Sequence, residues 1–327
     1  MEQTRSDKNK RKKKVWKKII LFFMLILLTV GCYAGYIFYQ TLQAANDSFS
    51  ALDRGDKSDL RDEAVTFGKE PVSILLLGIE DYATGGSGGR SDTIMVATFN
   101  PDLKTMKLLS IPRDTKVYIP SRDKYDKINH SFNDGKESTI ETVEEFLDIP
   151  IDYYATVNFE GFKNIIDEIG GVDVEVPFDF WEYTDKWPQE KIYFKEGLSH
   201  LNGEEALAYA RMRQRDPNGD FGRNERQKQI ISAMIDSIIS PKNLLKIDEI
   251  AKHASTNTET NIKASEGISF ITKFKSFTSD NIKSLTIEGT GGKDPISGIY
   301  YYIPDEDALE KLKSELQNHL EYKTLNN

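Results

Sequence analysis

The chain has 327 residues, of which 39% are hydrophobic and 29% are charged, with 11 prolines and one cysteine. This composition excludes a wholly disordered chain, a collagen-like repeat, a multi-span membrane protein and a framework of disulfides within the chain. The net charge is −9, yet residues 1–18 carry nine lysines and arginines against two acidic residues, and the acidic remainder argues against nucleic acid as a partner.

A run of 21 residues without any charge follows the basic segment, from Ile19 to Tyr39. As a helix it would extend about 32 Å, enough to cross a hydrocarbon layer of roughly 30 Å. Trp16 before the run is typical of a membrane interface, and the basic segment favours a cytoplasmic N-terminus. We therefore predict a cytoplasmic tail at 1–18, one N-terminal transmembrane helix at 19–39 and an external location for the rest. A cleaved signal peptide is the alternative, but its apolar core is usually shorter.

Residues 40–70 are polar and have no strong apolar period, which predicts an external stalk. Residues 71–327 then form one external domain, in which strand-like and helix-like segments alternate. The pattern predicts strands at Ser73–Ile79, Thr93–Phe99, Met106–Ile111, Tyr153–Phe159, Val172–Val176 and Ile282–Ile287. It predicts helices at Ser138–Leu147, Glu160–Ile169, Gly203–Ala210, Arg223–Ile239, Pro241–Ala251, Ala264–Phe277 and Asp305–Leu320, the first of them opened by a capping box of Ser138 and Glu141. This order predicts an α/β fold with a central sheet covered by helices.

The first candidate site is a Gly-rich loop, residues 78–93, that follows a strand predicted to be buried on both faces. Ligands of α/β sheets gather beyond the carboxyl ends of strands. Glu80 and Asp92 flank this loop, with Asp81 and Arg90 between them. Paired carboxylates suit Mg²⁺, which takes oxygen ligands and often bridges to a substrate phosphate. A solvated loop without a ligand is the alternative.

The second candidate is Arg113, which follows the third predicted strand in the segment SIPRDT. A strand-end salt bridge with a neighbouring acid is the alternative interpretation of this residue.

The third candidate is the arginine-rich segment 210–231. At 100° per residue, Arg223 and Gln227 share a face with the apolar residues of their predicted helix, so we expect both to point inward. Arg211 and Arg213 would point together if the chain becomes extended after Ala210. Converging arginines in an acidic domain indicate a polyphosphate or pyrophosphate ligand, because guanidinium binds phosphate oxygens bidentately. A solvated charged loop is the alternative. No nucleotide-binding glycine motif and no metal-spaced histidine set accompanies these clusters.

Several segments resemble successive motifs of the LytR-CpsA-Psr family. They are GRSDTIMVATFNP (89–101), LLSIPRDTKVYIP (108–120), KINHSFNDG (127–135), ETVEEFLDIPIDYYATVNFEGFKNIIDEIGGVDVEVP (141–177) and LNGEEALAYARMRQRDPNGDFGRNERQKQII (201–231). The resemblance implies an α/β/α sandwich with a central mixed sheet and an apolar tunnel for a polyprenyl chain. It also implies a single-pass protein of the cell membrane, with its C-terminal domain outside, in a Gram-positive bacterium.

The resemblance further implies a phosphotransferase. Its donor would be an anionic glycopolymer, wall teichoic acid or capsular polysaccharide, on a polyprenyl-pyrophosphate carrier, and its acceptor a peptidoglycan sugar hydroxyl. The pyrophosphate would be held by Arg90, Arg113, Arg211, Arg213, Arg223 and Gln227. Arg113 and Asp92 would act in catalysis. Mg²⁺, or Mn²⁺ in its place, would bind Glu80 and Asp92. In many members an Asp occupies the position of Glu80 and an Arg follows two residues later, whereas this chain has Glu80, Asp81 and Tyr82. Asp81 could therefore substitute for Glu80 as the ligand.

Two other functions remain open at this point. A polyprenyl-pyrophosphate phosphatase would use the same site with water as the acceptor. A membrane-anchored module that binds an envelope polymer without turnover is the second. The basic tail is expected to contact membrane lipid rather than DNA.

Overall fold

The computed structural model describes residues 48–79, 91–244, 246, 250, 257–274 and 276–322. The expected cytoplasmic tail and transmembrane helix lie outside these residues, as do Glu80, Asp81 and Arg90. In the described ranges, no helix combines the length and apolar character needed to cross a membrane.

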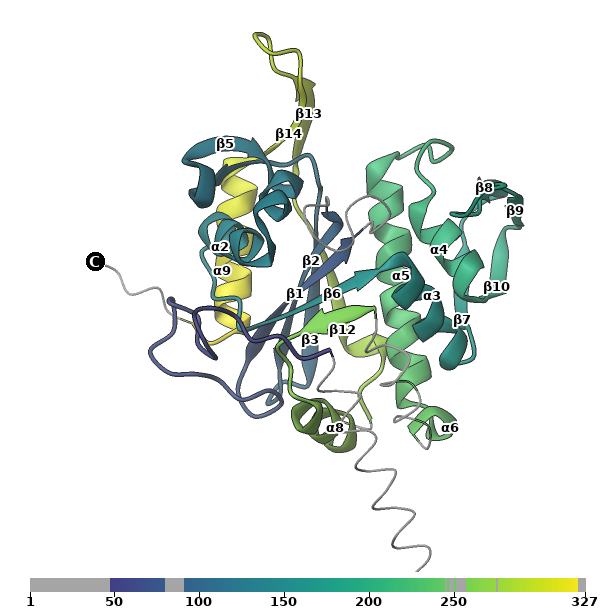
Figure 1. Ribbon diagram of the computed structural model, residues 1–327, viewed down its shortest axis with the longest axis horizontal. Coiled ribbons are helices and arrows are strands. Elements are labelled where there is room, and N and C mark those ends of the chain that lie inside the picture. The colour runs from purple at the N-terminus through teal and green to yellow at the C-terminus, as the bar shows by residue number, and fades with distance from the viewer. Residues whose placement is uncertain are drawn as a thin grey trace, which may run out of the picture.

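Six of the described strands form a central mixed sheet in the order β11–β6–β1–β2–β3–β12 (Figure 1). Neighbours β1, β2 and β3 are antiparallel, whereas β6 runs parallel to β1 and β12 parallel to β3. These strands are β1 (Val72–Ile79), β2 (Ser91–Asn100), β3 (Thr105–Ile111), β6 (Tyr153–Asn158), β11 (Thr258–Thr260) and β12 (Ile282–Thr286). The expected α/β fold with a central mixed sheet is confirmed.

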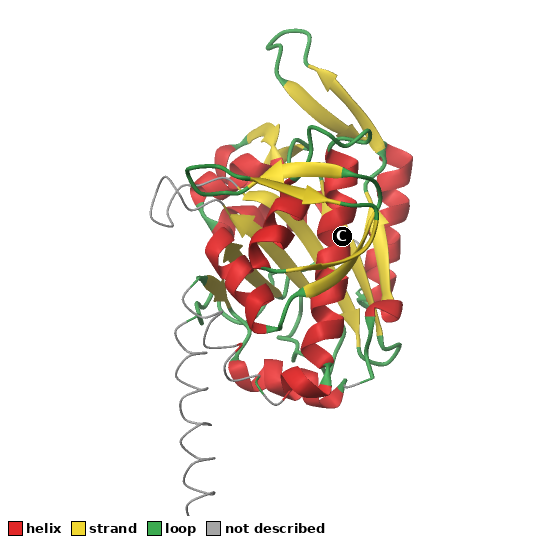
Figure 2. Ribbon diagram, turned by 90° about the vertical axis from the view of Figure 1, so that its right-hand side faces the viewer, coloured by secondary structure: helices red, strands yellow, loops and turns green. Residues whose placement is uncertain are grey.

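Helices cover both faces of this sheet (Figures 1 and 2). One face packs against α2 (Lys136–Leu147) and α9 (Glu306–His319). The other faces α5 (Asp220–Ile239) and α8 (Ala264–Lys273). A third cluster of buried side chains joins α5 to α3 (Phe159–Glu168), α4 (Gly203–Arg211), β7 (Val172–Val176) and β10 (Gly197–Leu201). The short helix α6 (Pro241–Leu244) follows α5.

Three antiparallel hairpins extend from this framework. They are β4–β5 (Lys116–Ile119 and Lys124–Lys127), β8–β9 (Phe180–Tyr183 and Lys191–Phe194) and β13–β14 (Gly289–Lys293 and Tyr300–Pro304). The β13–β14 hairpin projects away from the rest of the molecule (Figures 1 and 2). Short 3₁₀ turns, η1 (Pro120–Arg122), η2 (Ile128–Asp134) and η3 (Ser279–Asn281), complete the described elements.

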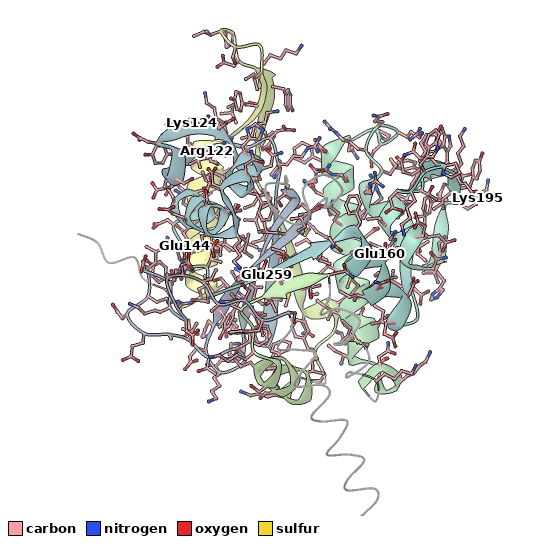
Figure 3. The ribbon with its side chains drawn as sticks, viewed as in Figure 1. Arg122, Lys124, Glu144, Glu160, Lys195 and Glu259 are labelled. Carbon is pink, nitrogen blue, oxygen red and sulfur yellow. The ribbon has the colours of Figure 1, made fainter. Side chains whose placement is uncertain are left out.

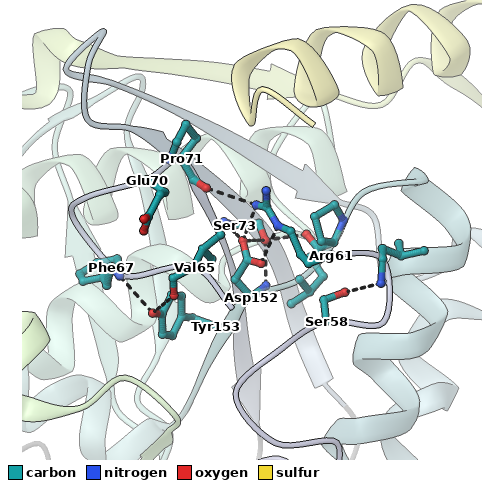
Figure 4. Close-up of polar contacts among 12 residues, drawn as sticks. Ser58, Arg61, Val65, Phe67, Glu70, Pro71, Ser73, Asp152 and Tyr153 are labelled. Carbon is teal, nitrogen blue, oxygen red and sulfur yellow. Dashed lines mark hydrogen bonds and ion pairs between the residues drawn. The ribbon is translucent and has the colours of Figure 1, made fainter. Parts of the chain in front are cut away.

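The stalk expected over residues 40–70 is wrong for its described part. Residues 48–70 lie against the domain, with Leu52 buried in its core. Ser58 donates a 2.6 Å hydrogen bond to Glu144 on α2. Arg61 forms a 2.8 Å ion pair with Asp152, which also accepts a hydrogen bond from the backbone of Ser73 (Figure 4). The polar composition of this segment therefore reflects ion pairs with the domain and not a solvated tether.

The capping box expected at the start of α2 is also wrong. The helix begins at Lys136 after Gly135, and no side chain caps it. The hydroxyl of Ser138 instead lies 2.7 Å from that of Ser121 at η1. The Ser138 hydroxyl thus makes a tertiary contact between α2 and η1 and does not cap its own helix.

Candidate active site

A polar pocket of about 370 Å³ lies where the end of β1 and the start of β2 meet the α4–α5 connection. It contains six of the residues that the sequence singled out: Asp92, Arg113, Arg211, Arg213, Arg223 and Gln227. Residues 92 and 227 are far apart in the sequence, so the sheet and α5 are what bring them together. Their convergence is observed, while their roles in binding or catalysis stay predictions.

Asp92 and Arg113 form the centre of the sheet side of the pocket. Nη1 of Arg113 donates a 2.6 Å hydrogen bond to Oδ1 of Asp92, and its Nε lies 3.8 Å from Oδ2 of Asp114. Burial lowers the pKa of Arg113, but the hydrogen bond and charge of Asp92 outweigh it and hold that pKa above its ordinary value. Arg113 thus makes a strand-end salt bridge and also lines the pocket.

The α4–α5 connection supplies the next arginines. Helix α4 ends at Arg211, and Met212 then has an extended backbone (φ −58°, ψ 124°). This extension places Arg211 and Arg213 in the same pocket, as the sequence argument required. The guanidinium carbon of Arg211 lies 4.9 Å from the centroid of Phe159, and Nε of Arg213 lies 3.1 Å from Oδ1 of Asp220.

The first turns of α5 close the pocket. Arg223 is 7% exposed and donates a 3.4 Å hydrogen bond to the backbone oxygen of Asp92. Burial lowers the pKa of Arg223 below its ordinary value, and the nearby charge of Arg113 lowers it further, against the opposing charge of Asp220. Gln227 donates to the hydroxyl of Thr93 at 3.1 Å. The inward direction expected for Arg223 and Gln227 is confirmed.

Two guanidinium nitrogens in this pocket lack an acceptor within the part of the chain that the structure describes. Nε of Arg223 and Nη1 of Arg211 are buried and form no hydrogen bond with any described residue. A buried donor without a partner is costly, typically about 1–3 kcal/mol and more on a charged group. Because arginines also outnumber carboxylates in the lining, an anion with several oxygens would satisfy both the charge and the donors.

Arg226 is a structural residue of this region whose burial the helical pattern did not reveal. It is 2% exposed and donates to the backbone oxygens of Tyr209 (3.0 Å) and Met212 and to the carboxylate of Asp216. These bonds fix the extended connection that carries Arg211 and Arg213. A Cβ at Gly222 would collide with the Asp216 carboxylate. A glycine is therefore required at this position of α5, beside the Arg226–Asp216 ion pair.

An apolar cavity of about 350 Å³ adjoins the polar pocket. It lies between the sheet and helices α3, α4 and α5, and its wall includes Met95, Phe162, Ile231, Met234, Ile235 and Ile238. The cavity and the polar pocket share five lining residues: Gly78, Thr93, Phe159, Arg211 and Gln227. An amphipathic ligand could therefore place an apolar chain in one and an anionic group in the other.

The β8–β9 hairpin supplies lining residues that the sequence did not indicate. Glu182, Tyr183 and Gln189 all face the polar pocket. Arg215 pairs with Glu182 at 3.2 Å, and its guanidinium lies 3.5 Å from the Trp181 ring centroid. These strands are short and half exposed, so neither length nor periodicity predicted them.

A buried lysine fixes this hairpin to the helical layer. Lys163 on α3 is 6% exposed and lies 3.1 Å from Asp185 in the hairpin loop. It also pairs at 3.3 Å with Glu204 on α4 and with Glu160, which Figure 3 labels. Burial lowers the pKa of Lys163, but the bond to Asp185 and the other acids hold it above its usual value.

Of the three predicted metal ligands, only Asp92 lies within the described residues. In the part of the chain that the structure describes, no group of three or more His, Cys, Asp or Glu side chains is arranged to hold a metal ion. Asp92 lies in the pocket, while Glu80 and Asp81 are outside the described residues.

Residues 35–318 match the model of the LytR_cpsA_psr family. The chain belongs to this family. It is 52% identical over 313 residues to the polyisoprenyl-teichoic acid–peptidoglycan teichoic acid transferase TagV of Bacillus subtilis, covering 95% of this chain and 80% of TagV. Over 319 residues it is 37% identical to the TagU transferase of the same organism, covering 97% of this chain and 99% of TagU.

Solved structures of LytR_cpsA_psr proteins share this fold. The crystal structure of B. subtilis TagV has a TM-score of 0.71 and 53% identity, over 78% of this chain and 99% of TagV's. A structure of TagT bound to LI-WTA has a TM-score of 0.68 and 33% identity, over 83% of this chain and 99% of TagT's.

Proposed function

We propose that this chain transfers an anionic glycopolymer from a polyprenyl-pyrophosphate carrier to a sugar hydroxyl of peptidoglycan. The observation that carries the proposal is the arginine-lined pocket that shares five residues with an apolar cavity. The names of its relatives, which are teichoic acid transferases, favour wall teichoic acid over capsular polysaccharide as the polymer.

The polar pocket would hold the pyrophosphate. Arg113, Arg211 and Arg223 contribute guanidinium groups, and those of Arg211 and Arg223 each retain a buried donor without an acceptor among the described residues. Gln227 adds an amide beside Thr93, and Arg213 lines the outer wall. Guanidinium groups bind phosphate oxygens with two parallel hydrogen bonds, so this set suits two linked phosphates. Arg90 belongs to the same proposal from the sequence alone.

The apolar cavity would hold the part of the polyprenyl chain nearest the pyrophosphate. Its wall is built from aliphatic, methionine and phenylalanine side chains of β2, α3 and α5. Burial of an apolar chain contributes roughly 25 cal/mol per Å². Binding energy from this remote part of the donor would thus position the reacting phosphorus in the polar pocket.

The reaction follows from this placement. The hydroxyl oxygen of the acceptor sugar attacks the phosphorus that carries the glycopolymer, and the bond from that phosphorus to polyprenyl phosphate breaks. Polyprenyl phosphate leaves, and a phosphodiester joins polymer to peptidoglycan. Arg113, Arg211 and Arg223 offset the charge that develops on the phosphate oxygens. Asp92, whose carboxylate is oriented by the 2.6 Å hydrogen bond from Arg113, would take the hydroxyl proton.

The donor set fits a magnesium ion. Mg²⁺ is commonly held by one or two carboxylates together with substrate phosphates, and Asp92 provides one carboxylate beside the proposed pyrophosphate site. Glu80, or Asp81 in its place, would provide the second, and Mn²⁺ could substitute for Mg²⁺. When bound, such a cation would neutralise phosphate charge.

We also propose that the domain lies on the external face of the cell membrane of a Gram-positive bacterium. The uncharged run Ile19–Tyr39 and the preceding basic segment support this placement. A membrane anchor would keep the domain near its lipid-linked donor, and peptidoglycan would be within reach as the acceptor.

The test uses the full chain in detergent with a polyprenyl-pyrophosphate-linked oligosaccharide, Mg²⁺ and nascent peptidoglycan oligomers. Mass spectrometry should detect an oligosaccharide–phosphate–glycan adduct that is lost in Arg113→Ala and in EDTA. Release of carrier phosphate and free oligosaccharide without an adduct would establish the phosphatase instead. Donor binding without any turnover would establish a binding module.

A further inference from the structure

The β13–β14 hairpin carries exposed aromatic and aliphatic side chains that the proposed transfer has not used. Tyr300 is 43% exposed and Ile303 is 45% exposed, and the hairpin stands clear of the rest of the domain (Figures 1 and 2). Exposed apolar surface of this kind often marks a binding site.

The base of this hairpin is attached beside the polar pocket. The backbone nitrogen of Tyr302 donates a 2.9 Å hydrogen bond to the backbone oxygen of Asp114, which directly follows Arg113. Tyr302 is 4% exposed, and its ring centroid lies 5.7 Å from that of Phe221 at the start of α5. Phe221 is in turn two residues from Arg223. The face of the hairpin that carries Tyr302 therefore packs on the core and on the start of α5, close in the chain to the pocket residues Arg113 and Arg223.

Tyr300 lies on that same face, because side chains two residues apart in a strand point to the same side. Its ring crosses the backbone of Gly291 on β13, where an added Cβ would collide with the ring and its hydroxyl. The glycine thus lets the ring lie against the strand with its other side available to solvent. Phe221 is 43% exposed as well. Phe221 packs on the buried Tyr302 ring, and Tyr300 lies two residues from Tyr302 on the same face of the strand. We call the two exposed rings, Phe221 and Tyr300, the aromatic strip.

We propose that this aromatic strip binds the glycan strand of the acceptor, an inference that rests on the proposed function. Pyranose rings present faces of C–H groups, and these pack on the electron-rich face of an aromatic ring. A polymeric acceptor needs contacts beyond the one sugar that reacts, and exposed rings outside the pocket could supply them.

The geometry of the transfer assigns the strip to the acceptor and not to the donor. The attacking and leaving oxygens of a phosphoryl transfer lie roughly in line on opposite sides of the phosphorus. The polyprenyl phosphate would leave on the side of the apolar cavity, marked by the shared residues Arg211 and Gln227. Asp92 and Arg113 line the polar pocket without lining the cavity. The acceptor therefore approaches from their side, where Asp114 holds the hairpin.

A binding experiment tests the strip without any donor. The probe is glycan strands released from peptidoglycan by amidase digestion, titrated against the full chain in detergent. We expect Tyr300→Ala to weaken binding about tenfold, the upper range for one aromatic packing contact, and Tyr300→Phe to retain it. The matched control is Tyr193→Ala, because Tyr193 is another solvent-accessible tyrosine, 69% exposed, on the β8–β9 hairpin. This substitution should leave glycan binding unchanged. Thermal unfolding confirms that each variant is folded.

Kinetics then separate this inference from the proposed function. With both substrates, Tyr300→Ala should raise the KM for peptidoglycan oligomers about tenfold while leaving kcat and donor affinity unchanged. If Tyr300→Ala leaves both the acceptor KM and glycan binding unchanged, the strip does not bind the acceptor. An equal loss of glycan binding in Tyr193→Ala would overturn the proposal as well. If the wild-type chain forms no adduct but binds glycan strands through Tyr300, the transferase proposal fails and the glycan site stands.

Discussion

The two faces of the central sheet have similar apolar side chains but are packed differently. Against α2 and α9, buried residues such as Leu77, Val143 and Leu316 form a continuous core. On the other face, the C-terminal half of β1 borders a cavity of about 350 Å³ that α3, α4 and α5 enclose. The N-terminal half of β1 belongs to a cluster filled by phenylalanines of α8 and of the segment after it. Hydrophobic composition alone thus does not distinguish a filled core from a binding cavity.

Small residues on the sheet help to leave this space. Gly78 and Ala155 line the cavity, and a Cβ on Gly78 would lie 2.9 Å from Cβ of Thr93. On the opposite face, large side chains such as Leu75 and Tyr154 are fully buried. The difference predicts that substitutions on the filled face change stability, whereas those around the cavity and pocket change function.

The largest effect is expected at Arg113. Arg113→Ala should lower the rate of polymer transfer about a hundredfold or more, because it removes charge that stabilises the transferring phosphate. The matched control is Arg122→Ala, since Arg122 pairs with Asp134 at the surface (Figure 3) and should keep full activity. Adduct formation measured by mass spectrometry decides, and near-normal transfer by Arg113→Ala would contradict the assigned role.

The next effect concerns packing. Leu316→Ala on α9, where the side chain is 0% exposed, should lower the free energy of unfolding by roughly 2–5 kcal/mol. Ile231→Ala, at the cavity wall, should lower it by clearly less because that side chain has fewer packed neighbours to lose. Denaturant unfolding of both variants measures the difference. Equal losses would show that the two faces are packed alike.

Lowering the pH should reduce the stability of the fold through protonation of His319, which lies on the filled face of the sheet. Its Nδ1 is hydrogen-bonded to Thr98 at 2.7 Å and its Nε2 to Thr105 at 3.0 Å, and burial, with the charge of Lys107, lowers its pKa to about 4. Between pH 6.5 and 4 the unfolded chain binds a proton that the folded chain does not. Stability should therefore fall as pH falls through this range, by about 3 kcal/mol at most.

Unfolding measured at several pH values checks this expectation against His319→Gln, which should lose most of the dependence between pH 6.5 and 4. A slope that is equal in both proteins would assign the acid sensitivity to other groups.

The smallest effect on stability is expected inside the cavity. Ala155→Leu should change the free energy of unfolding by less than about 1 kcal/mol, because space is available and the overpacking strain of a filled core is avoided. The same substitution should weaken binding of a long-chain polyprenyl pyrophosphate about tenfold, since roughly 1.4 kcal/mol of apolar burial is enough for that change. A short-chain carrier should bind as before. Strong destabilisation would instead indicate that the site is already filled.

Much of the framework could be predicted from local patterns. The uninterrupted apolar run of β1 indicated a strand buried on both faces, and β7 (Val172–Val176) was predicted at its observed bounds. The 100° periodicity of α5 placed Arg223 and Gln227 inward, which the pocket confirms. These predictions succeeded because strand alternation and helical period directly determine which side chains share a face.

Other features depended on contacts between distant segments. Residues 48–70 were predicted to be a stalk because their polar composition is typical of a solvated segment. The partners of Ser58 and Arg61, Glu144 and Asp152, lie about ninety residues further along the chain, so no local pattern indicates these contacts. The β8–β9 hairpin escaped prediction because its strands have four residues each. Its position at the pocket depends on the Lys163–Asp185 ion pair, which no sequence period reveals.

The sequence by itself determined most strands of the central sheet and the longer helices, the inward direction of Arg223 and Gln227, and the family to which the chain belongs, since these follow from local periodicity and ordered motifs. Only the tertiary structure decided that Arg211 and Arg223 share one pocket with Asp92, that this pocket adjoins a cavity, and that the β13–β14 hairpin is held at Asp114. The physical reason is that a pocket is defined by what the packing leaves open, and packing depends on the shapes of all neighbouring segments at once.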